Sequence, residues 1–139
     1  MLLKSDGTKD GTVFVKDINS GSNLAFPGNN PNFFVFNNAL YFVAYTPANG
    51  TEIWKTDGTE AGTVLLRDIN VGTGSITTSP YNLHFTILNG FLYFLANDGG
   101  GNVQLWRTDG TTAGTTRITN STNNAALFRL LVSRVVATG

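Results

Sequence analysis

The sequence predicts an all-β fold from its composition, its turn signals and a recurring motif. Sixteen glycines and ten phenylalanines occur among the 139 residues, whereas only Glu52 and Glu60 are glutamates. Gly, Asn, Asp and Thr, all well represented, favour turns and strands, while Glu, Lys, Ala and Gln favour helices. Short apolar runs end at Asn-Gly or Asp-Gly pairs, which are typical of tight hairpin turns. We therefore expect many short antiparallel strands.

The recurring motif is the strongest of these observations. The residues KSDGTKDGT at 4–12 return as KTDGTEAGT at 55–63 and as RTDGTTAGT at 107–115. The spacing is 51 residues from Gly7 to Gly58 and 52 residues from Gly58 to Gly110. LYFVA at 40–44 also matches LYFLA at 92–96, so whole structural units repeat rather than one loop. The positions assigned to the structural motif are Asp6, Gly7, Thr8, Gly11, Thr12, Trp54, Asp57, Gly58, Thr59, Gly62, Thr63, Trp106, Asp109, Gly110, Thr111, Gly114 and Thr115.

Each complete unit predicts four strands. The expected ranges are 33–37, 39–45, 51–56 and 63–69 in one unit, and 83–88, 91–96, 103–107 and 115–118 in the next. The connections are short, which predicts an antiparallel meander. Four-stranded antiparallel sheets at a spacing of about 50 residues are typical of β-propeller blades. The expected fold class is therefore all-β, a partial propeller-like array of two whole blades plus fragments.

The propeller-like interpretation divides the chain into four segments. Residues 1–31 form a partial first blade (its outer strands) and a connection, 32–70 the second blade, 71–119 a connection and the third blade, and 120–139 a divergent tail. The chain opens within a unit, as though the first two strands of that blade were missing. Residues 125–136 fit both strand and helical periodicity, so the tail supplies either closing strands or an apolar helical cap. Because propellers need about four to eight blades, we expect further blades of a longer chain or self-association that completes a ring.

Composition argues against several classes of function. Nine Lys and Arg residues balance nine Asp and Glu residues, and the chain has no cysteine. A chain without a basic run lacks the footprint for nucleic-acid binding. A chain without cysteine has no disulfide, thiolate metal site or cysteine nucleophile. No apolar stretch approaches the roughly 18–20 residues of a membrane span. We expect no cofactor, no nucleic-acid partner and no membrane span.

The Asp-Gly-Thr loops allow a structural and a metal-binding interpretation. An Asp carboxylate accepts backbone N–H bonds two residues further on, and Gly supplies the positive φ of a tight turn. Calcium needs six to eight oxygen ligands, whereas each loop offers one fixed carboxylate, that of Asp6, Asp57 or Asp109. We favour structural turns and expect no metal.

The two tryptophans allow a core and a sugar-stacking interpretation. Trp54 and Trp106 occupy the same place in their units, and the matching residue of the first unit is Leu3. Leucine has no aromatic face on which a sugar stacks, and a Trp repeated in stacked sheets is more often a core residue. We expect both tryptophans between blades.

No constellation of residues selects an enzyme. His84 is the only histidine, and no nucleophile or phosphate-loop motif accompanies it. Asp98 and Glu52 are one dispersed acid–base pair, but nothing in the sequence selects it. The pairs Lys16-Asp17 and Arg67-Asp68 are adjacent in expected strands, so their side chains point to opposite faces and form solvated or inter-blade ion pairs. We predict no catalytic residue and no enzymatic activity.

One family resembles the repeated unit. EIWKTDGTEAGT at 52–63 and QLWRTDGT at 104–111 resemble the ELWxxDGT repeat of long secreted bacterial proteins, and the first unit matches only from Lys4 onward. The resemblance covers residues 1–118. It implies a propeller-like β-repeat architecture and an extracellular or cell-surface setting, and it supplies no catalytic or binding residues.

The expected function is a non-enzymatic repeat module of a bacterial secreted or cell-surface protein. Such a module mediates adhesion or binds a ligand or protein partner. One alternative is a lectin-like propeller that binds glycans at the repeated loops. Another is a fragment of a propeller-type hydrolase or lyase, whose catalytic residues would lie at unrepeated positions such as His84.

Overall fold

The computed structural model describes residues 1–21, 25–26, 31–76 and 83–122. Every regular element in this part of the chain is a β-strand, which confirms the all-β prediction. These residues also hold no helix of the length and apolarity that a membrane crossing requires. The question of strand or helix for residues 125–136 lies outside the described residues.

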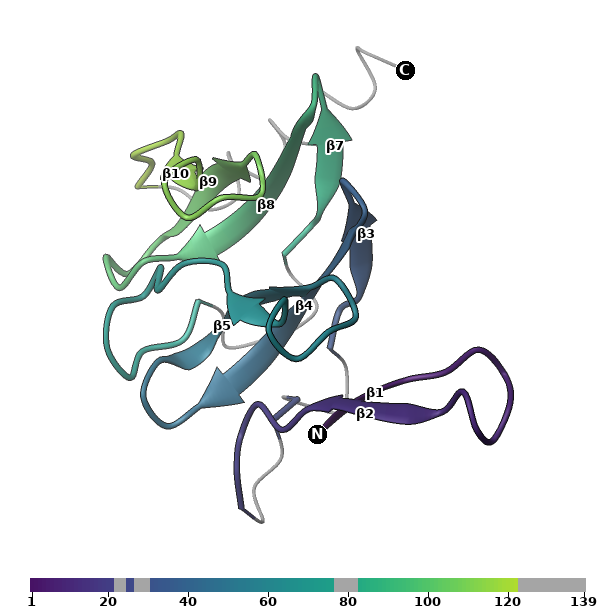
Figure 1. The fold of residues 1–139 in the computed structure, drawn as a ribbon. Helices are drawn as coiled ribbons and strands as arrows, with labels where there is room; N and C mark the ends of the chain where they lie inside the picture. The colour runs from purple at the N-terminus through teal and green to yellow at the C-terminus, as the bar shows by residue number, and fades with distance from the viewer. Residues whose placement is uncertain (22–24, 27–30, 77–82, 123–139) are drawn as a thin grey trace.

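Three antiparallel sheets follow one another in chain order (Figure 1). The first, which we call the N-terminal ribbon, pairs β1 (Leu2–Lys4) with β2 (Val13–Lys16). The central sheet contains β3 (Phe34–Phe36), β4 (Ala39–Thr46), β5 (Gly50–Thr56) and β6 (Val64–Leu65). The C-terminal sheet contains β7 (Thr86–Leu88), β8 (Phe91–Asn97), β9 (Val103–Thr108) and β10 (Thr116–Arg117). Both larger sheets are the predicted four-stranded meanders.

The first hairpin of each larger sheet turns through two residues in the left-handed region. Asn37 and Asn38 have φ values of 47° and 60°, and Asn89 and Gly90 have values of 51° and 78°. Two consecutive positive φ angles define the type I′ turn, whose twist matches that of the flanking strands. The turn predicted at Asn89-Gly90 is therefore present.

In each larger sheet, the first and the last strand are shorter than predicted. The expected strand 63–69 is reduced to β6 (Val64–Leu65). Leu66 still donates to the Ile53 carbonyl of β5, but the N–H groups of Ile69 and Asn70 donate to the Glu52 carboxylate instead of to a neighbouring strand. Arg67 and Asp68 thus lie beyond the end of β6 and not in the strand that was predicted for them. The expected strand 83–88 begins only at Thr86, because His84 has a φ of 51° that interrupts the extended backbone.

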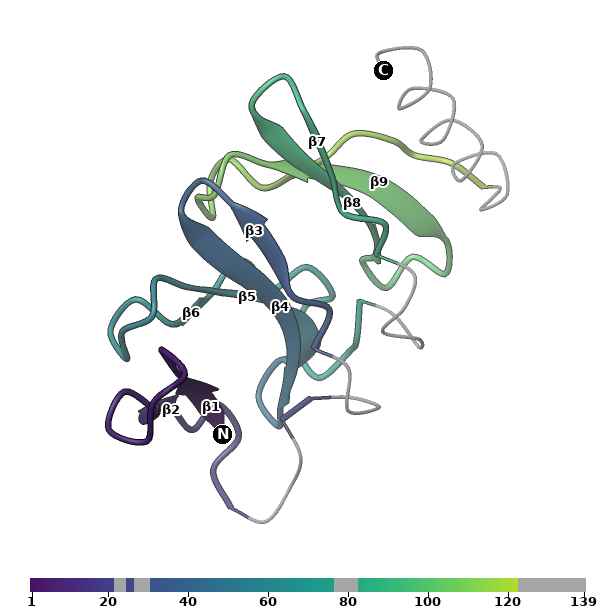
Figure 2. The same ribbon diagram turned by 90° about the vertical axis from the view of Figure 1, so that its right-hand side faces the viewer.

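The central sheet packs between the other two (Figure 2). Strand alternation sends Phe42 and Trp54 to the face that meets Leu2 and Val15 of the ribbon. The opposite face meets the C-terminal sheet in a second cluster, whose main members are Tyr41, Val43, Ile53, Phe94, Ala96 and Trp106. Each of the two larger sheets therefore presents its Phe–Trp pair to the sheet before it in the chain, so all three sheets are stacked in the same orientation.

One face of the ribbon corresponds to the face of the larger sheets that carries the Phe–Trp pair, and we call it the front face. Among the described residues, no sheet packs against this front face. Leu3 is paired with Phe14 as Trp54 is paired with Leu65. Leu3 is 52% exposed and Phe14 is 53% exposed, whereas Trp54 is buried. Leu3 and Phe14 therefore form an exposed apolar surface at one end of the row of three sheets.

Candidate functional site

The Asp-Gly-Thr loops have the same internal hydrogen bonds in all three copies. In the loop after β5, Oδ1 of Asp57 accepts the Thr59 amide at 2.9 Å and the Thr59 hydroxyl at 2.6 Å. The Thr59 hydroxyl in turn accepts the Gly62 amide at 2.9 Å. Oγ1 of Thr63 lies 2.6 Å from the Thr56 hydroxyl. The loops after β1 and β9 repeat this pattern with these residues: Ser5, Asp6, Thr8, Gly11, Thr12, Thr108, Asp109, Thr111, Gly114 and Thr115.

The second glycine of each loop is required by space rather than by backbone angle. A Cβ on Gly62 would lie 2.0 Å from Oδ1 of Asp57, and one on Gly114 would lie 2.0 Å from Oδ1 of Asp109. Any larger residue collides with the carboxylate around which the loop closes. The first glycine, Gly58 with φ at 91°, is instead required by its left-handed backbone.

The carboxylates of Asp6, Asp57 and Asp109 accept hydrogen bonds from residues of their own loops. The Thr59 hydroxyl, together with the Thr59 amide, holds the pKa of Asp57 below its usual range, and Thr8 and Thr111 do the same for Asp6 and Asp109. In the part of the chain that the structure describes, no three His, Cys, Asp or Glu side chains gather where they could hold a metal ion. The loops thus have the geometry of structural turns.

The second and third loops also contact the sheet that precedes them in the chain. Lys16 Nζ donates to the Thr63 carbonyl at 3.0 Å, and Arg67 Nη1 donates to the Thr115 carbonyl at 2.5 Å. Lys55 Nζ donates to the carbonyl of Gly110. These basic side chains therefore bind backbone carbonyls of the next sheet, in place of the solvated or inter-blade ion pairs predicted for Lys16 and Arg67.

Trp54 and Trp106 are core residues. Trp54 is 9% exposed in the cluster with the ribbon, and Trp106 is 6% exposed in the cluster with the central sheet. The guanidinium of Arg67 lies over the Trp106 ring, 5.9 Å from its centroid. A sugar stacks on an open indole face, and neither indole has one. Both Nε1 atoms are buried, without a hydrogen-bond partner in the described structure.

A buried carboxyl group, that of Glu52, lies near the start of β5. Glu52 is fully buried, and its two carboxyl oxygens accept the amides of Asn70 at 2.8 Å and Ile69 at 3.2 Å. Burial raises the pKa of Glu52 to about 8, against the opposing effect of these two N–H donors. A carboxyl group in this state exchanges a proton near neutral pH, which makes it the strongest candidate for acid–base chemistry among the described residues.

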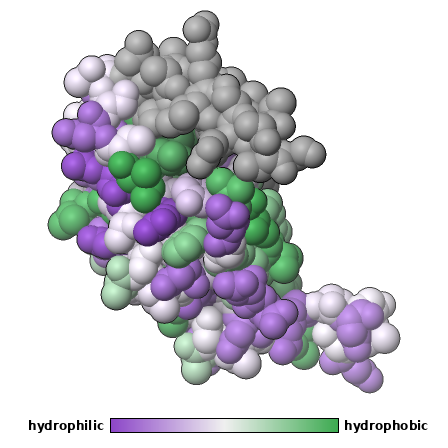
Figure 3. All heavy atoms as spheres, turned by 90° about the horizontal axis from the view of Figure 1, so that it is seen from above, coloured by the Kyte–Doolittle hydropathy of each residue, from purple (hydrophilic) through white to green (hydrophobic). Residues whose placement is uncertain are grey.

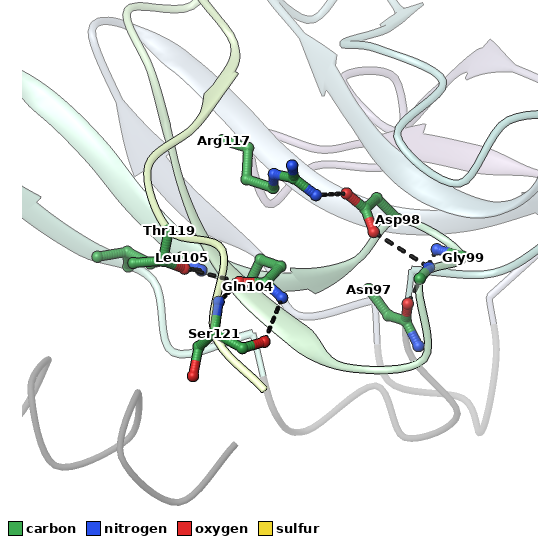
Figure 4. Close-up of polar contacts among 9 residues, drawn as sticks. Asn97, Asp98, Gly99, Gln104, Leu105, Arg117, Thr119 and Ser121 are labelled. Atoms are coloured by element: carbon green, nitrogen blue, oxygen red, sulfur yellow. Dashed lines mark hydrogen bonds and ion pairs between the residues drawn. The ribbon is translucent and has the colours of Figure 1, made fainter. Parts of the chain in front are cut away.

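The matching position of the C-terminal sheet shows what this group does (Figure 4). Gln104 occupies it, and its Oε1 accepts the Ser121 amide and the Thr119 hydroxyl, both at 2.9 Å. Its Nε2 donates to the Ser121 carbonyl at 2.9 Å. The amide anchors the strand after the loop as Glu52 does, although it cannot exchange a proton in this pH range. Glu52 and Gln104 occupy the same place in the repeated unit, and this correspondence is the signal in the sequence for a shared anchoring role.

The residues considered for acid–base chemistry have different hydrogen-bond partners. His84 is exposed, just before β7. Asp98 follows β8 and pairs with Arg117 of β10 at 2.7 Å (Figure 4). Glu52 bonds to backbone amides of the central sheet instead, so Asp98 and Glu52 have different partners. Asn70 lies between the two, since its amide donates to Glu52 and its Oδ1 would be 3.0 Å from a Cβ on Gly99, and no hydrogen bond joins the two carboxyl groups in the described structure.

A cavity of about 380 Å³ lies between the ribbon and the central sheet. It is lined by Leu2, Leu3, Lys4, Val15, Val35, Asn38, Ala39, Leu40, Thr56, Asp57 and Gly58. Elsewhere, the view from above shows hydrophilic and hydrophobic residues mixed over the described surface (Figure 3). Exposed apolar side chains also occur on the larger sheets, for example Val35 and Ile87, but the cavity is the place where several of them line a hollow, so the cavity with the ribbon beside it is the candidate interaction site.

Comparison with known proteins adds no relative. No protein-family model, curated protein or solved structure matches this chain. The site must therefore be interpreted from its own geometry.

Proposed function

We propose that this chain is a non-enzymatic repeat module that makes protein contacts by stacking sheets face to face, in the manner of propeller blades. The observation that carries the proposal is the repeated junction: a basic side chain of one sheet binds a loop carbonyl of the next, beside a continuous apolar cluster. The same geometry at both junctions supports an architecture that adds units in one direction.

The chemistry of the buried acid supports the non-enzymatic part of the proposal. A general acid or base must exchange its proton, and Gln104 occupies the matching place with similar hydrogen bonds although it cannot do so. An anchoring role accounts for both residues. The resemblance to the ELWxxDGT repeat supports a secreted or cell-surface bacterial setting, in which such modules mediate adhesion.

The open face of the ribbon supports association through that surface. Leu3 and Phe14 expose apolar side chains at positions where the larger sheets bury Trp54 and Leu65 against a neighbour. Exposed apolar patches bounded by polar residues are typical of protein-contact surfaces. The partner is a second stacked sheet, supplied by another copy or by further repeats.

Light scattering over a range of protein concentrations tests this function. We expect the native chain to associate above the monomer mass, and Phe14→Lys to shift the equilibrium toward the monomer. Val71→Lys is the matched control, because Val71 is equally apolar and 81% exposed but lies outside every sheet. A native chain that stays monomeric at all concentrations contradicts the proposal. A glycan array that yields saturable binding would instead favour a lectin.

A further inference from the structure

We infer that the free edge of β1 and the cavity beside it bind a two-stranded β-hairpin of a partner polypeptide, one that carries a Tyr-Phe-aliphatic sequence in its second strand. The inference rests on the stacking proposed above and adds the chemistry of the partner. The surface is distinct from the front face of Phe14, because it consists of the edge of β1 and the cavity behind it.

The edge of β1 is a backbone template. Among the described residues, β1 pairs only with β2, whereas β5 and β9, the matching strands, each have a neighbour on both sides. The Ile53 carbonyl accepts the Leu66 amide on the β6 side, so the N–H and C=O of Trp54 point toward β4. Leu3 matches Trp54 in register, so its N–H and C=O point to the open edge. Such an edge adds a strand by main-chain hydrogen bonding.

The junction between the central and C-terminal sheets shows what fills the corresponding space. There, Tyr41 and Phe36 lie with ring centroids 5.8 Å apart and are almost fully buried. The Tyr41 hydroxyl reaches the loop of the next sheet, 2.9 Å from where a Cβ on Gly110 would be. At the ribbon, the matching loop residue Gly58 lines the cavity, and a Cβ on it would meet no described atom within 4 Å except those of the Lys4 side chain.

Two equivalent leucines show that the junction between the ribbon and the central sheet is packed less completely than the next junction. Leu92 of the C-terminal sheet is fully buried, whereas the matching Leu40 of the central sheet is half-buried and lines the cavity. An apolar cavity of about 380 Å³ has room for aromatic and aliphatic side chains, and filling it removes further apolar surface from water. The ligand is therefore apolar on the face that meets the central sheet.

The registers of the larger sheets specify the sequence of the ligand. Tyr41, Phe42 and Val43 of β4 lie opposite Lys55, Trp54 and Ile53. Transferred to β1, a tyrosine lies opposite Lys4, a phenylalanine opposite Leu3 and an aliphatic residue opposite Leu2. The tyrosine and the aliphatic residue point into the cavity, and the phenylalanine points to the outer face. The first strand of the hairpin adds an aromatic or leucine residue at the place of Phe36.

A labelled synthetic peptide with the sequence of residues 33–46, flanked by lysines for solubility, tests the inference by fluorescence anisotropy with the full chain. We expect saturable binding with one peptide per chain. Leu3→Pro should weaken binding about tenfold or more, because it removes one edge N–H while a proline with its nitrogen toward the open edge is tolerated there. Leu3→Ala is the matched control and should bind within about threefold, because it keeps the N–H.

The peptide provides a second, independent control. Tyr41→Ala in the peptide should weaken binding about tenfold, since its side chain enters the cavity, and Phe42→Ala on the outer face should have a smaller effect. A chain with residues 33–51 fused before Met1 should no longer bind the peptide, because its own hairpin occupies the edge. Absence of binding to the native chain, or equal binding to the Leu3→Pro and fused chains, overturns the inference. Either result leaves the Phe14 light-scattering outcome untouched, so failure of the hairpin site and failure of the stacking function are distinguishable.

Discussion

Replacement of Glu52 by glutamine should convert a pH-dependent stability into a nearly pH-independent one. Glu52 is fully buried, and both of its carboxyl oxygens accept backbone amides, those of Ile69 and Asn70. Glutamine has nearly the same shape and keeps one carbonyl oxygen as an acceptor. Gln104 in the matching position shows that an amide is accommodated by this backbone.

The direction and size of the effect follow from the pKa of Glu52. Burial raises the folded-state pKa from 4.5 to about 8. Between these values the unfolded chain has released the proton and the folded chain has kept it, so the free energy of unfolding falls as pH rises through this window. Each pKa unit corresponds to about 1.4 kcal/mol, which gives a loss on the order of 3–6 kcal/mol between about pH 4.5 and pH 8.

Urea unfolding followed by tryptophan fluorescence at about pH 5, 7 and 9 measures this difference. We expect native chain and Glu52→Gln to have similar stability at the acidic end and the variant to be the more stable at the alkaline end. The loop carboxylates do not interfere, because the lowered pKa values of Asp6, Asp57 and Asp109 place their titration on the acid side of this window.

Gln104→Glu provides the reciprocal control. An ionised carboxylate there would face the Ser121 carbonyl, to which the Gln104 amide now donates. This variant should therefore acquire a second loss of stability with rising pH. A stability difference between native chain and Glu52→Gln that does not change with pH, or that favours the native chain at high pH, would refute the reasoning.

Three further substitutions test the loops and junctions by urea unfolding. Gly62→Ala should cost about 2–4 kcal/mol because its Cβ collides with the Asp57 carboxylate, and the cost should fall when Asp57→Ser removes that group; equal costs in both backgrounds would contradict this. Arg67→Ala should cost about 1–3 kcal/mol because it removes a hydrogen bond between sheets and the contact with a buried ring, whereas Arg117→Ala, in an exposed pair within one sheet, should cost less than about 1 kcal/mol; the reverse order would exclude the junction role. Trp106→Phe should cost about 1–3 kcal/mol from lost volume alone, because its Nε1 has no hydrogen-bond partner among the described residues, so a loss above about 4 kcal/mol would reveal a polar role.

The strands and loops were predictable from sequence because their causes are local. The Asp57–Thr59–Gly62 bonds join residues two or three positions apart, so the motif itself encodes the turn. The Asn89-Gly90 pair likewise defines its hairpin through the positive φ of two adjacent residues. The predicted ranges of the two middle strands of each larger sheet were close to those observed, since alternation and aromatic content act within one strand.

The ends of the outer strands were not predictable because they depend on distant partners. The predicted strand does not reach residue 69, where the amides of Ile69 and Asn70 donate to Glu52, which lies 17 and 18 residues away from them. Arg67 reaches the Thr115 carbonyl, 48 residues further along the chain. Alternation within a strand holds only while the strand continues, so it does not apply to Arg67 and Asp68, which follow β6.

The sequence by itself determined the antiparallel hairpins, the closed Asp-Gly-Thr loops and the apolar character of Trp54 and Trp106. These properties follow from bonds and periodicities within a few residues. The tertiary structure alone decided which face of each sheet meets which neighbour, how burial shifts the pKa of Glu52, and where an edge and a cavity stand open beside β1. Those properties depend on removing side chains from water by sheets that lie far apart in the sequence, which no local pattern contains.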